Sequence, residues 1–500
     1  MDINSISSSA FQGLQMAQAG MLVTSQNVSG ASVDGYSRRN ANAVIDSMAP
    51  NAANLTGTGF AVNGFVRQYN SLISGQLLNQ QSQSSYTDTL VQYTSSVNSL
   101  VANNSTGLQT SIASFFNAMG TYATNPTSPS AQSGLTGSAN QVAASMAGMV
   151  SVVSQLTSNA QSGLADSVDQ VNTLLPQLAQ VNQQIVNSNA GGKNTGVSPD
   201  LLDQRDVILG KIQTLVGGQS LINSDGTATQ FLGGTPLIER GISNKLVVNY
   251  PNTLNPSLSI QSGSSSQTMA IKNPTTGQIG GLMTLITQFV PSLNQRLNTI
   301  AQGLVSIANN VSGASVNSNG SLKLFAFNVN GSYLGDTRPF AVDPTVGDLT
   351  NSIPTITSDA AMTSLYQANA TDSLALIAGG LTAANFVSRA PSDNGDYLSS
   401  GSAIITSSDA NTVSQKITIM GNAVANLVSD VGVPISTWTN NQTANQAVLS
   451  NLKSQQSSIS GVNLDEEAAN LLKFQQLYQA SSKVLQAGNQ MFQSILSIMN

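Results

Sequence analysis

The stretch GVNLDEEAANLLKFQQLYQA, residues 461–480, opens the last segment of this 500-residue chain and decides how its ends are arranged. From here to the C-terminus large apolar residues recur every seven positions, which is typical of a helix that packs along other helices. The positions beside this seam carry Gln, Ser, Asn and Ala in place of the charges that usually select one coiled-coil partner. We therefore expect a helix with more than one neighbouring helix. Its seam consists of Leu464, Leu471, Tyr478, Leu485, Phe492 and Met499.

The same stretch begins with polar residues that predict where the helix starts. Asn463 is a good N-cap, and Glu466 follows it at the three-residue spacing of a capping box. Asp465 and Glu467 also fall in the first turn, where the helix dipole favours negative charge. Neighbouring carboxylates around one turn do not face each other across a cleft, so we interpret them as helix-start residues and not as a catalytic pair.

The N-terminal segment carries a second helical pattern. Apolar residues within 3–28 recur at alternating steps of three and four, and small residues such as Gly13 and Gly20 would let another backbone come close. The pattern stops at SGASVDGYSRR, where Asp34-Gly35 is a turn dipeptide. We expect both terminal helices to pack inside an assembly of like subunits. On this first helix the predicted contact residues are Leu14, Met21 and Val28.

The middle of the chain alternates between β-rich and helical stretches. Residues 40–68 alternate weakly and contain several glycines, which indicates short strands, whereas residues 130–187 predict one long helix. Another helix starts at SPDLLDQRD, where Ser198 can cap, Pro199 suits the first helical position and Asp200 lies at the positive end of the dipole. We interpret the charges of this helix as a solvated face.

These patterns predict an α+β multidomain protein: an elongated helical body with N- and C-terminal coiled-coil helices brought together and β-rich inserted domains. The alternation of helical segments and β inserts suggests that both chain ends return to the same end of the body. The expected terminal coiled-coil domain comprises residues 1–35 and 462–500, the mainly helical body 36–216, 280–312 and 404–461, and the β-rich outer part 217–279 and 313–403.

Composition narrows the possible functions. Only 8% of the residues are charged and the net charge is -6, so we expect neither nucleic-acid binding nor membrane insertion. The chain contains no Cys and no His, which excludes disulfides and removes the commonest general base and zinc ligands. It also contains no G-x-S-x-G elbow and no P-loop. We therefore expect no catalytic residue, no cofactor and no metal. The start, MDINSISSSAFQG, lacks the basic flank of a cleaved signal peptide.

Four stretches resemble a known family. SQNVSGASVDGYSRR, residues 25–39, resembles the N-terminal signature of bacterial flagellar axial proteins, and its Gly-Tyr-Ser-Arg form is similar to the hook-associated proteins of the hook–filament junction, the FlgK family. The signature turn consists of Gly35, Tyr36, Ser37 and Arg38. The other three stretches follow in the family's order: DLLDQRDVIL at 200–209, TTGQIGGLMTL at 275–285 and SGVNLDEEAANLLKFQQLYQASSKVLQ at 460–486.

Three positions depart from the residues that are usual in this family. Gly30 stands where a better helix former is expected, Asp34 replaces a proline and Arg39 replaces a glutamine. All three lie near the predicted end of the first helix.

The resemblance implies a structural role in the extracellular flagellum. Proteins of this family leave the cell through the flagellar export apparatus without a cleaved signal peptide, and an export chaperone holds the C-terminal helix until then. They form a homo-oligomeric ring on the hook protein, followed by a second hook–filament junction protein and then flagellin, with the terminal helices as the inner tube. Another axial protein of the same architecture, such as hook protein or a flagellin, is an alternative interpretation, and an enzyme is the third class.

Overall fold

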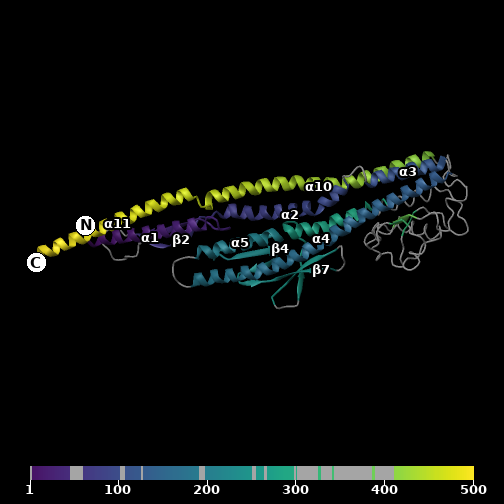
Figure 1. Ribbon diagram of the computed structural model, residues 1–500. Helices are drawn as coiled ribbons and strands as arrows, with labels where there is room; N and C mark the ends of the chain where they lie inside the picture. The colour runs from purple at the N-terminus through teal and green to yellow at the C-terminus, as the bar shows by residue number, and fades with distance from the viewer. Residues whose placement is uncertain are drawn as a thin grey trace.

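The computed structural model shows a long molecule built mainly from helices (Figure 1). Both chain ends lie at one tip, where α1 and α11 run side by side, in agreement with the expected α+β architecture. The structure describes residues 3–45, 60–101, 107–124, 128–190, 197–250, 255–263, 267–294, 296–297, 300, 325–327, 341–342, 386–388 and 410–499.

The helices form a terminal pair and a body. The terminal pair is α1 (Ile3–Gly30) and α11 (Leu464–Met499). The body helices are α2 (Ser71–Val101), α3 (Leu108–Thr124), α4 (Pro129–Ala190), α5 (Pro199–Val216), α6 (Gly277–Thr284), the π-helical turn η1 (Leu285–Phe289) and α10 (Ala410–Ser460).

The body is organised along the longest helix, α4, which packs against α3 at one end and against α5 and α6 nearer its other end. At 62 residues this helix spans about 93 Å. Its apolar residues recur at steps of three and four, so that Leu164, Val168, Val171 and Leu175 all fall on one buried face. The second long helix, α10, lies along α2 and leads directly into α11 (Figure 1).

In the described parts of the chain, four small sheets accompany these helices. A hairpin of β1 and β2 follows α1, and the sheets β3-β4-β5-β6 and β7-β8-β9 are antiparallel. In the sheet β10-β12-β11, β12 pairs antiparallel with β10 and parallel with β11. The strands are β1 (Arg39–Ile45), β2 (Phe60–Arg67), β3 (Gln219–Ile222), β4 (Ala228–Leu232), β5 (Thr235–Glu239), β6 (Ile242–Ser243), β7 (Lys245–Asn249), β8 (Ser257–Gln261), β9 (Thr268–Ala270), β10 (Phe325–Phe327), β11 (Ala341–Val342) and β12 (Phe386–Ser388).

Two asparagines of α4 attach the central sheets to the body. Asn182 is fully buried; its Nδ2 donates to the carbonyl oxygens of Ala228 at 2.8 Å and Arg240 at 2.7 Å, and its Oδ1 accepts from the Ala228 N–H at 2.9 Å. Asn172 pairs in the same way with the N–H and C=O of Leu246, at 2.8 Å each. The amides thus replace neighbouring strands and satisfy backbone groups that would otherwise be buried unpaired.

The predicted helices and strands that fall on described residues are confirmed, with one local correction. The structure confirms strands within 40–68 and one long helix where residues 130–187 predict it. Ser198 does occupy the N-cap of α5 and Pro199 the first position, but the Ser198 side chain makes no capping hydrogen bond, so that detail was wrong. The predicted domain limits stay a prediction, since most of 313–403 lies outside the described residues. Within the described parts of the chain, no helix has both the length and the apolar character needed to cross a bilayer.

We expect Asn182→Ala to destabilise the protein, because it leaves the two buried backbone groups of Ala228 and the part-buried Arg240 carbonyl without this partner. The free energy of unfolding should fall by roughly 2 to 4 kcal/mol, at 1 to 3 for each unsatisfied group with partial relaxation. Urea unfolding followed by circular dichroism measures this change. Asn189→Ala is the matched control, since Asn189 is exposed and donates one bond, to the Asp225 carbonyl. Equal effects of the two substitutions would contradict the assigned role of Asn182.

Candidate assembly surface on the terminal helices

The contact between α1 and α11 uses a line of residues that repeats every seven positions along α11. Glu467, Ser481 and Gly488 on this line are buried and Phe474 is half-buried. The line is three residues out of step with the seam predicted from the sequence. The heptad period was therefore correct, but the residues that face α1 are not the large apolar ones.

Small residues of α1 let the two helices approach closely. A Cβ atom on Gly13 would overlap the Ser481 hydroxyl, and one on Gly20 would overlap the Phe474 ring. Ala17 and Gly20 are buried between these contacts. The expectation that small residues of the first helix permit close packing is thus confirmed, and α11 of the same chain is the helix that approaches.

The predicted contact residues lie beside this line and remain largely exposed. On α11, exposure is 55% for Leu464, 36% for Leu471, 39% for Tyr478 and 53% for Phe492, whereas Leu485 is half-buried. The side chain of Met499 lies outside the described residues. On α1, Leu14 and Met21 are half-buried and Val28 is 47% exposed. The structure therefore leaves their predicted role in contacts with other subunits untested.

Helical geometry explains how an apolar face can be both covered and exposed. At about 3.5 residues per turn, the line that faces α1 lies about 50° from the predicted seam and about 50° from a third heptad line, which runs on its other side. We call the first exposed line the Leu471 flank and the second the Val484 flank. The Leu471 flank comprises Leu464, Leu471, Tyr478, Leu485 and Phe492, and the Val484 flank comprises Leu477, Val484 and Met491. Thus α1 covers the middle of the apolar face of α11 and leaves a flank free on each side.

The signature turn locks the end of α1. Asn27 Oδ1 accepts from the Tyr36 hydroxyl at 2.9 Å and from the Arg39 N–H at 2.9 Å, while Asn27 Nδ2 donates to the Arg39 carbonyl at 3.0 Å. The Tyr36 ring covers Gly30, where a Cβ would overlap the ring, so this departure from the family's usual residue is explained by the turn. Burial raises the pKa of the Tyr36 hydroxyl, which keeps it a neutral donor.

Glycine is also required at Gly35. Its φ of 79° is unfavourable for residues with a side chain, and a Cβ there would overlap the Val207 side chain of α5. The turn therefore lies directly against α5. Asp34 replaces the usual proline of the family and is exposed at this turn.

Arg38 ties the turn to the start of α11. Its guanidinium donates to both oxygens of Glu466, at 2.7 and 3.0 Å, and to Glu467 at 2.9 Å, while its N–H donates to the Ser460 carbonyl at 2.8 Å. The Glu467 side chain is only 2% exposed. The hydrogen bond to Glu466 raises the pKa of Arg38. Asn463 caps α11 as predicted, but Glu466 binds Arg38.

A second ion-pair group joins the hairpin to α5. Arg39 of β1 lies 2.5 Å from Asp200 and 3.2 Å from Asp203, and Arg67 of β2 lies 3.2 Å from Asp203 and 2.7 Å from Asp206. The acidic residues recur every three positions, so they share one face of α5. The Arg39 guanidinium also lies over the Tyr36 ring, 4.6 Å from its centroid.

These contacts correct the prediction that the charges of α5 form a solvated face. Asp203 and Arg205 are buried, and the Arg39 and Arg67 side chains are only 6% and 7% exposed. The sequence analysis also missed the pairing of Arg38 with Glu466 and Glu467. A usable signal existed, because charges are rare in this chain and opposite charges gather in the stretches that resemble the family.

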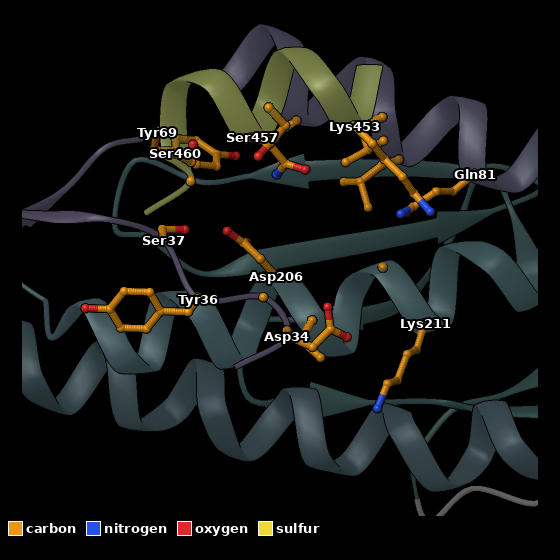
Figure 2. A pocket seen from close by; sticks show the side chains of 18 of the residues that line it. Asp34, Tyr36, Ser37, Tyr69, Gln81, Asp206, Lys211, Lys453, Ser457 and Ser460 are labelled. Atoms are coloured by element: carbon orange, nitrogen blue, oxygen red, sulfur yellow. The ribbon is translucent and has the colours of Figure 1, made fainter. Parts of the chain in front are cut away.

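A cavity of about 620 Å³ lies beside the signature turn. Gly35, Tyr36 and Ser37 line it, whereas Arg38 is not among its lining residues. Figure 2 shows Asp206 of α5 on one side and Lys453 and Ser457 of α10 on the other. Among the described residues no group of three or more carboxylates, His or Cys is arranged to hold a metal ion. The chemistry of this region is therefore the attachment of the terminal helices to the body.

Comparisons with known proteins identify the same segments. The family model for the helical domain of flagellar hook-associated protein FlgK matches residues 94–325, and that for the C-terminal part of the flagellar basal body rod proteins FlgEFG matches residues 453–498. Flagellar hook-associated protein 1 of Salmonella typhimurium is 27% identical over 558 residues, covering 99% of this chain and 100% of the relative. The Escherichia coli protein is 27% identical over 548 residues, with 99% and 100% coverage.

A solved structure also matches in part. The hook junction protein FlgK from Burkholderia pseudomallei is 28% identical, with a TM-score of 0.44 over 51% of this chain and 47% of that one. Together, the helical architecture with paired termini and the sequence matches define a structural protein of the bacterial flagellum. The particular proteins that this chain resembles over nearly its full length are the flagellar hook-associated proteins 1, the FlgK family.

We expect Gly20→Ala to weaken the pairing of α1 and α11, because the added methyl overlaps the Phe474 ring. Hydrogen exchange of the α11 amides should speed up by roughly tenfold or more, since overpacking costs about 1 to 3 kcal/mol. Gly75→Ala in α2 is the control. Nothing lies near its Cβ position, and replacing a helical glycine stabilises by up to about 1 kcal/mol. Unchanged α11 exchange in the Gly20 variant would disprove the close packing.

We expect Arg38→Ala to release the start of α11, because it leaves the buried Glu467 carboxylate without a cation. The cost should be about 2 kcal/mol, between the values for exposed and fully buried pairs. Limited proteolysis near Gly461 should become several times faster. Arg240→Ala is the matched control, because Arg240 is exposed and lies 3.8 Å from its partner Asp225. Equal proteolysis rates in both variants would argue against an anchoring role for Arg38.

Proposed function

We propose that this protein is the adaptor between hook and filament, and that copies of it assemble through their terminal helices into a ring. The observation that carries the proposal is the pair of exposed flanks on α11, one on each side of α1. A single neighbour could cover one flank. Two flanks on opposite sides call for a neighbour on each side, as every subunit of a closed ring or tube has.

The size of the flanks agrees with cooperative assembly. Burying a half-exposed large apolar side chain contributes roughly 1 kcal/mol, so the eight flank residues together contribute roughly 8 kcal/mol. Association itself costs about 4 to 15 kcal/mol. One flank alone contributes roughly 3 to 5 kcal/mol, at the bottom of this range, so covering both flanks favours assembly more than covering one.

The proposed partners are those that the resemblance to the FlgK family implies. In the assembly we place hook protein on one side of the ring and the second hook–filament junction protein on the other. Before assembly the exposed flanks of α11 need a cover, which fits an export chaperone bound to this helix. The chain would reach the extracellular flagellum through the flagellar export apparatus, without a cleaved signal peptide.

We assign the parts of the chain to layers of this ring. Residues 1–35 and 462–500 would form the inner tube, and residues 36–216, 280–312 and 404–461 the helical body around it. Residues 217–279 and 313–403 would lie outermost. The support for this order is that α1 and α11 extend from one end of the body, which leaves their flanks accessible to neighbours (Figure 1).

A second candidate is another axial protein, such as hook protein or a flagellin. It is favoured by the match of residues 453–498 to the C-terminal part of the rod proteins, since that segment includes most of α11. A deletion strain separates the two. Loss of a junction protein should leave complete hooks while unpolymerised flagellin escapes into the medium, whereas loss of hook protein should leave no hooks.

We expect Leu471→Asp and Val484→Asp each to abolish incorporation, because a charge buried without a partner in a subunit contact costs several kcal/mol. The amount of each variant protein in purified hook–basal bodies should fall at least about tenfold. A loss of only about 1.4 kcal/mol in binding free energy is enough for this effect. Gln476→Asp is the matched control, since Gln476 is exposed on the face of α11 away from both flanks. Normal incorporation of both flank variants would rule out this mechanism of assembly.

A further inference from the structure

The contact between α10 and α2 is unusually polar in its middle. On α10, Ile435 and Leu452 are buried, but no residue between them is buried. Trp438, Gln442 and Asn445 are only half-buried there. Hydrogen bonds between side chains therefore define how the two helices are aligned over this part of their contact.

Asp88 of α2 is the centre of these hydrogen bonds. Its Oδ1 accepts from Gln442 at 2.7 Å and from Gln446 at 2.9 Å, and its Oδ2 accepts from Ser84 at 3.3 Å. None of the ion pairs within the described residues involves Asp88. On the α10 side the carboxylate is thus held by amide donors, and any amide at the same place could serve it equally well.

Asn445 makes the other contacts. Gln80 Nε2 donates to its carbonyl and side-chain oxygens, both at 3.1 Å, and its own amide lies 3.4 Å from the Thr87 hydroxyl. Thus α10 contacts α2 through Asn445 and through the residue that follows it, Gln446.

The same Asn-Gln pair occurs four residues earlier in α10. The sequence NNQTANQ, residues 440–446, contains Asn441-Gln442 and Asn445-Gln446. Apolar residues of α10 repeat with the same step. Leu427 lies four residues before Val431, Val431 lies four before Ile435, and Val448 lies four before Leu452. A displacement of α10 by four residues therefore places amides on amides at positions 445 and 446 and apolar residues on apolar residues at positions 431, 435 and 452.

We propose that α10 has a second register on α2, in which Asn441 and Gln442 take the places of Asn445 and Gln446. The displacement is about 6 Å along the helix with a rotation of about 40°. One-turn displacements of packed helices are a known form of conformational switch. In the second register Trp438 takes the place of Gln442, where its indole N–H is again a donor for Asp88.

Two cavities border the contact between α10 and α2. A cavity of about 380 Å³ is lined by Thr87, Asn441 and Asn445, and the cavity of about 620 Å³ borders Lys453, Ser457 and Gly461 at the end of α10. The movement breaks the bond from the Arg38 N–H to the Ser460 carbonyl and shifts α10 toward α11. In a ring between two tubes it would adjust the position of the terminal helices relative to the body.

The test uses the purified full-length chain, so its outcome does not depend on the proposed function. The chain has no cysteine, so every thiol is an introduced one. Thr87→Cys is combined with Asn445→Cys to report the observed register and with Asn441→Cys to report the second. Thr87→Cys combined with Leu449→Cys reports a displacement of α10 by four residues in the opposite direction, which would place position 449 against position 87. The rate of disulfide formation under mild oxidation is measured for each pair.

Two matched substitutions then bias the registers in opposite directions. Gln446→Leu removes a donor to Asp88 in the observed register only, and should raise the rate of the 87–441 pair about tenfold. Trp438→Phe removes the indole donor that binds Asp88 in the second register only, and should lower that rate about tenfold, as expected for one bond to a charged group. The proposal is overturned if both substitutions change the 87–441 rate in the same direction, if neither changes it, or if Gln446→Leu raises the 87–449 rate equally.

Discussion

The structure depends on the way in which α1 covers only the middle of the apolar face of α11. Glycines at Gly13 and Gly20 bring the helices close enough for Ser481 and Phe474 to pack against α1. Large side chains on both sides of this line then remain exposed on a helix pair that extends from one end of the body (Figure 1). Exposed apolar side chains gathered in this way are typical of a surface that contacts other proteins, which is the basis of the proposed assembly.

The attachment of this pair to the body uses six of the nine ion pairs that the described residues make. The chain has 17 basic and 23 acidic residues, and its best-paired ones gather where α1, α11, the hairpin and α5 meet. Buried ion pairs fix orientation, since each charge needs its own partner at a defined place. The terminal pair is therefore held in one direction relative to α5, which a structural ring component needs if neighbouring subunits are to meet in the same geometry.

The sequence predicted what depends on local patterns. The helices within 3–28 and 130–187, the short strands within 40–68, the cap at Asn463 and the class of protein could all be predicted from periodicity, turn residues and motif resemblance. It did not predict which heptad line faces α1, because the largest residues of α11 were taken as the contact line. The close approach instead selects the small residues of α1 and the line through Phe474.

The ion pairs were missed for a different reason. The charges of α5 lie at helix-surface spacing, and the chain alone does not say that Arg39 and Arg67 come from a hairpin 130 or more residues earlier in the sequence to bury them. Likewise, Glu466 has the position of a capping-box residue, and only the folded turn brings Arg38 near enough to bind it. Long-range partners of this kind are fixed by topology and not by local sequence.

The most direct test of the central claim is thiol labelling of the single-cysteine variants Leu471→Cys, Val484→Cys and Phe474→Cys, in the free protein and in purified hook–filament structures. We expect the thiols introduced at the two flank positions, Leu471 and Val484, to react readily in the free protein and to be protected after assembly. The thiol introduced at Phe474 should be protected in both states, because this position faces α1. Equal labelling of both flanks before and after assembly would contradict the account.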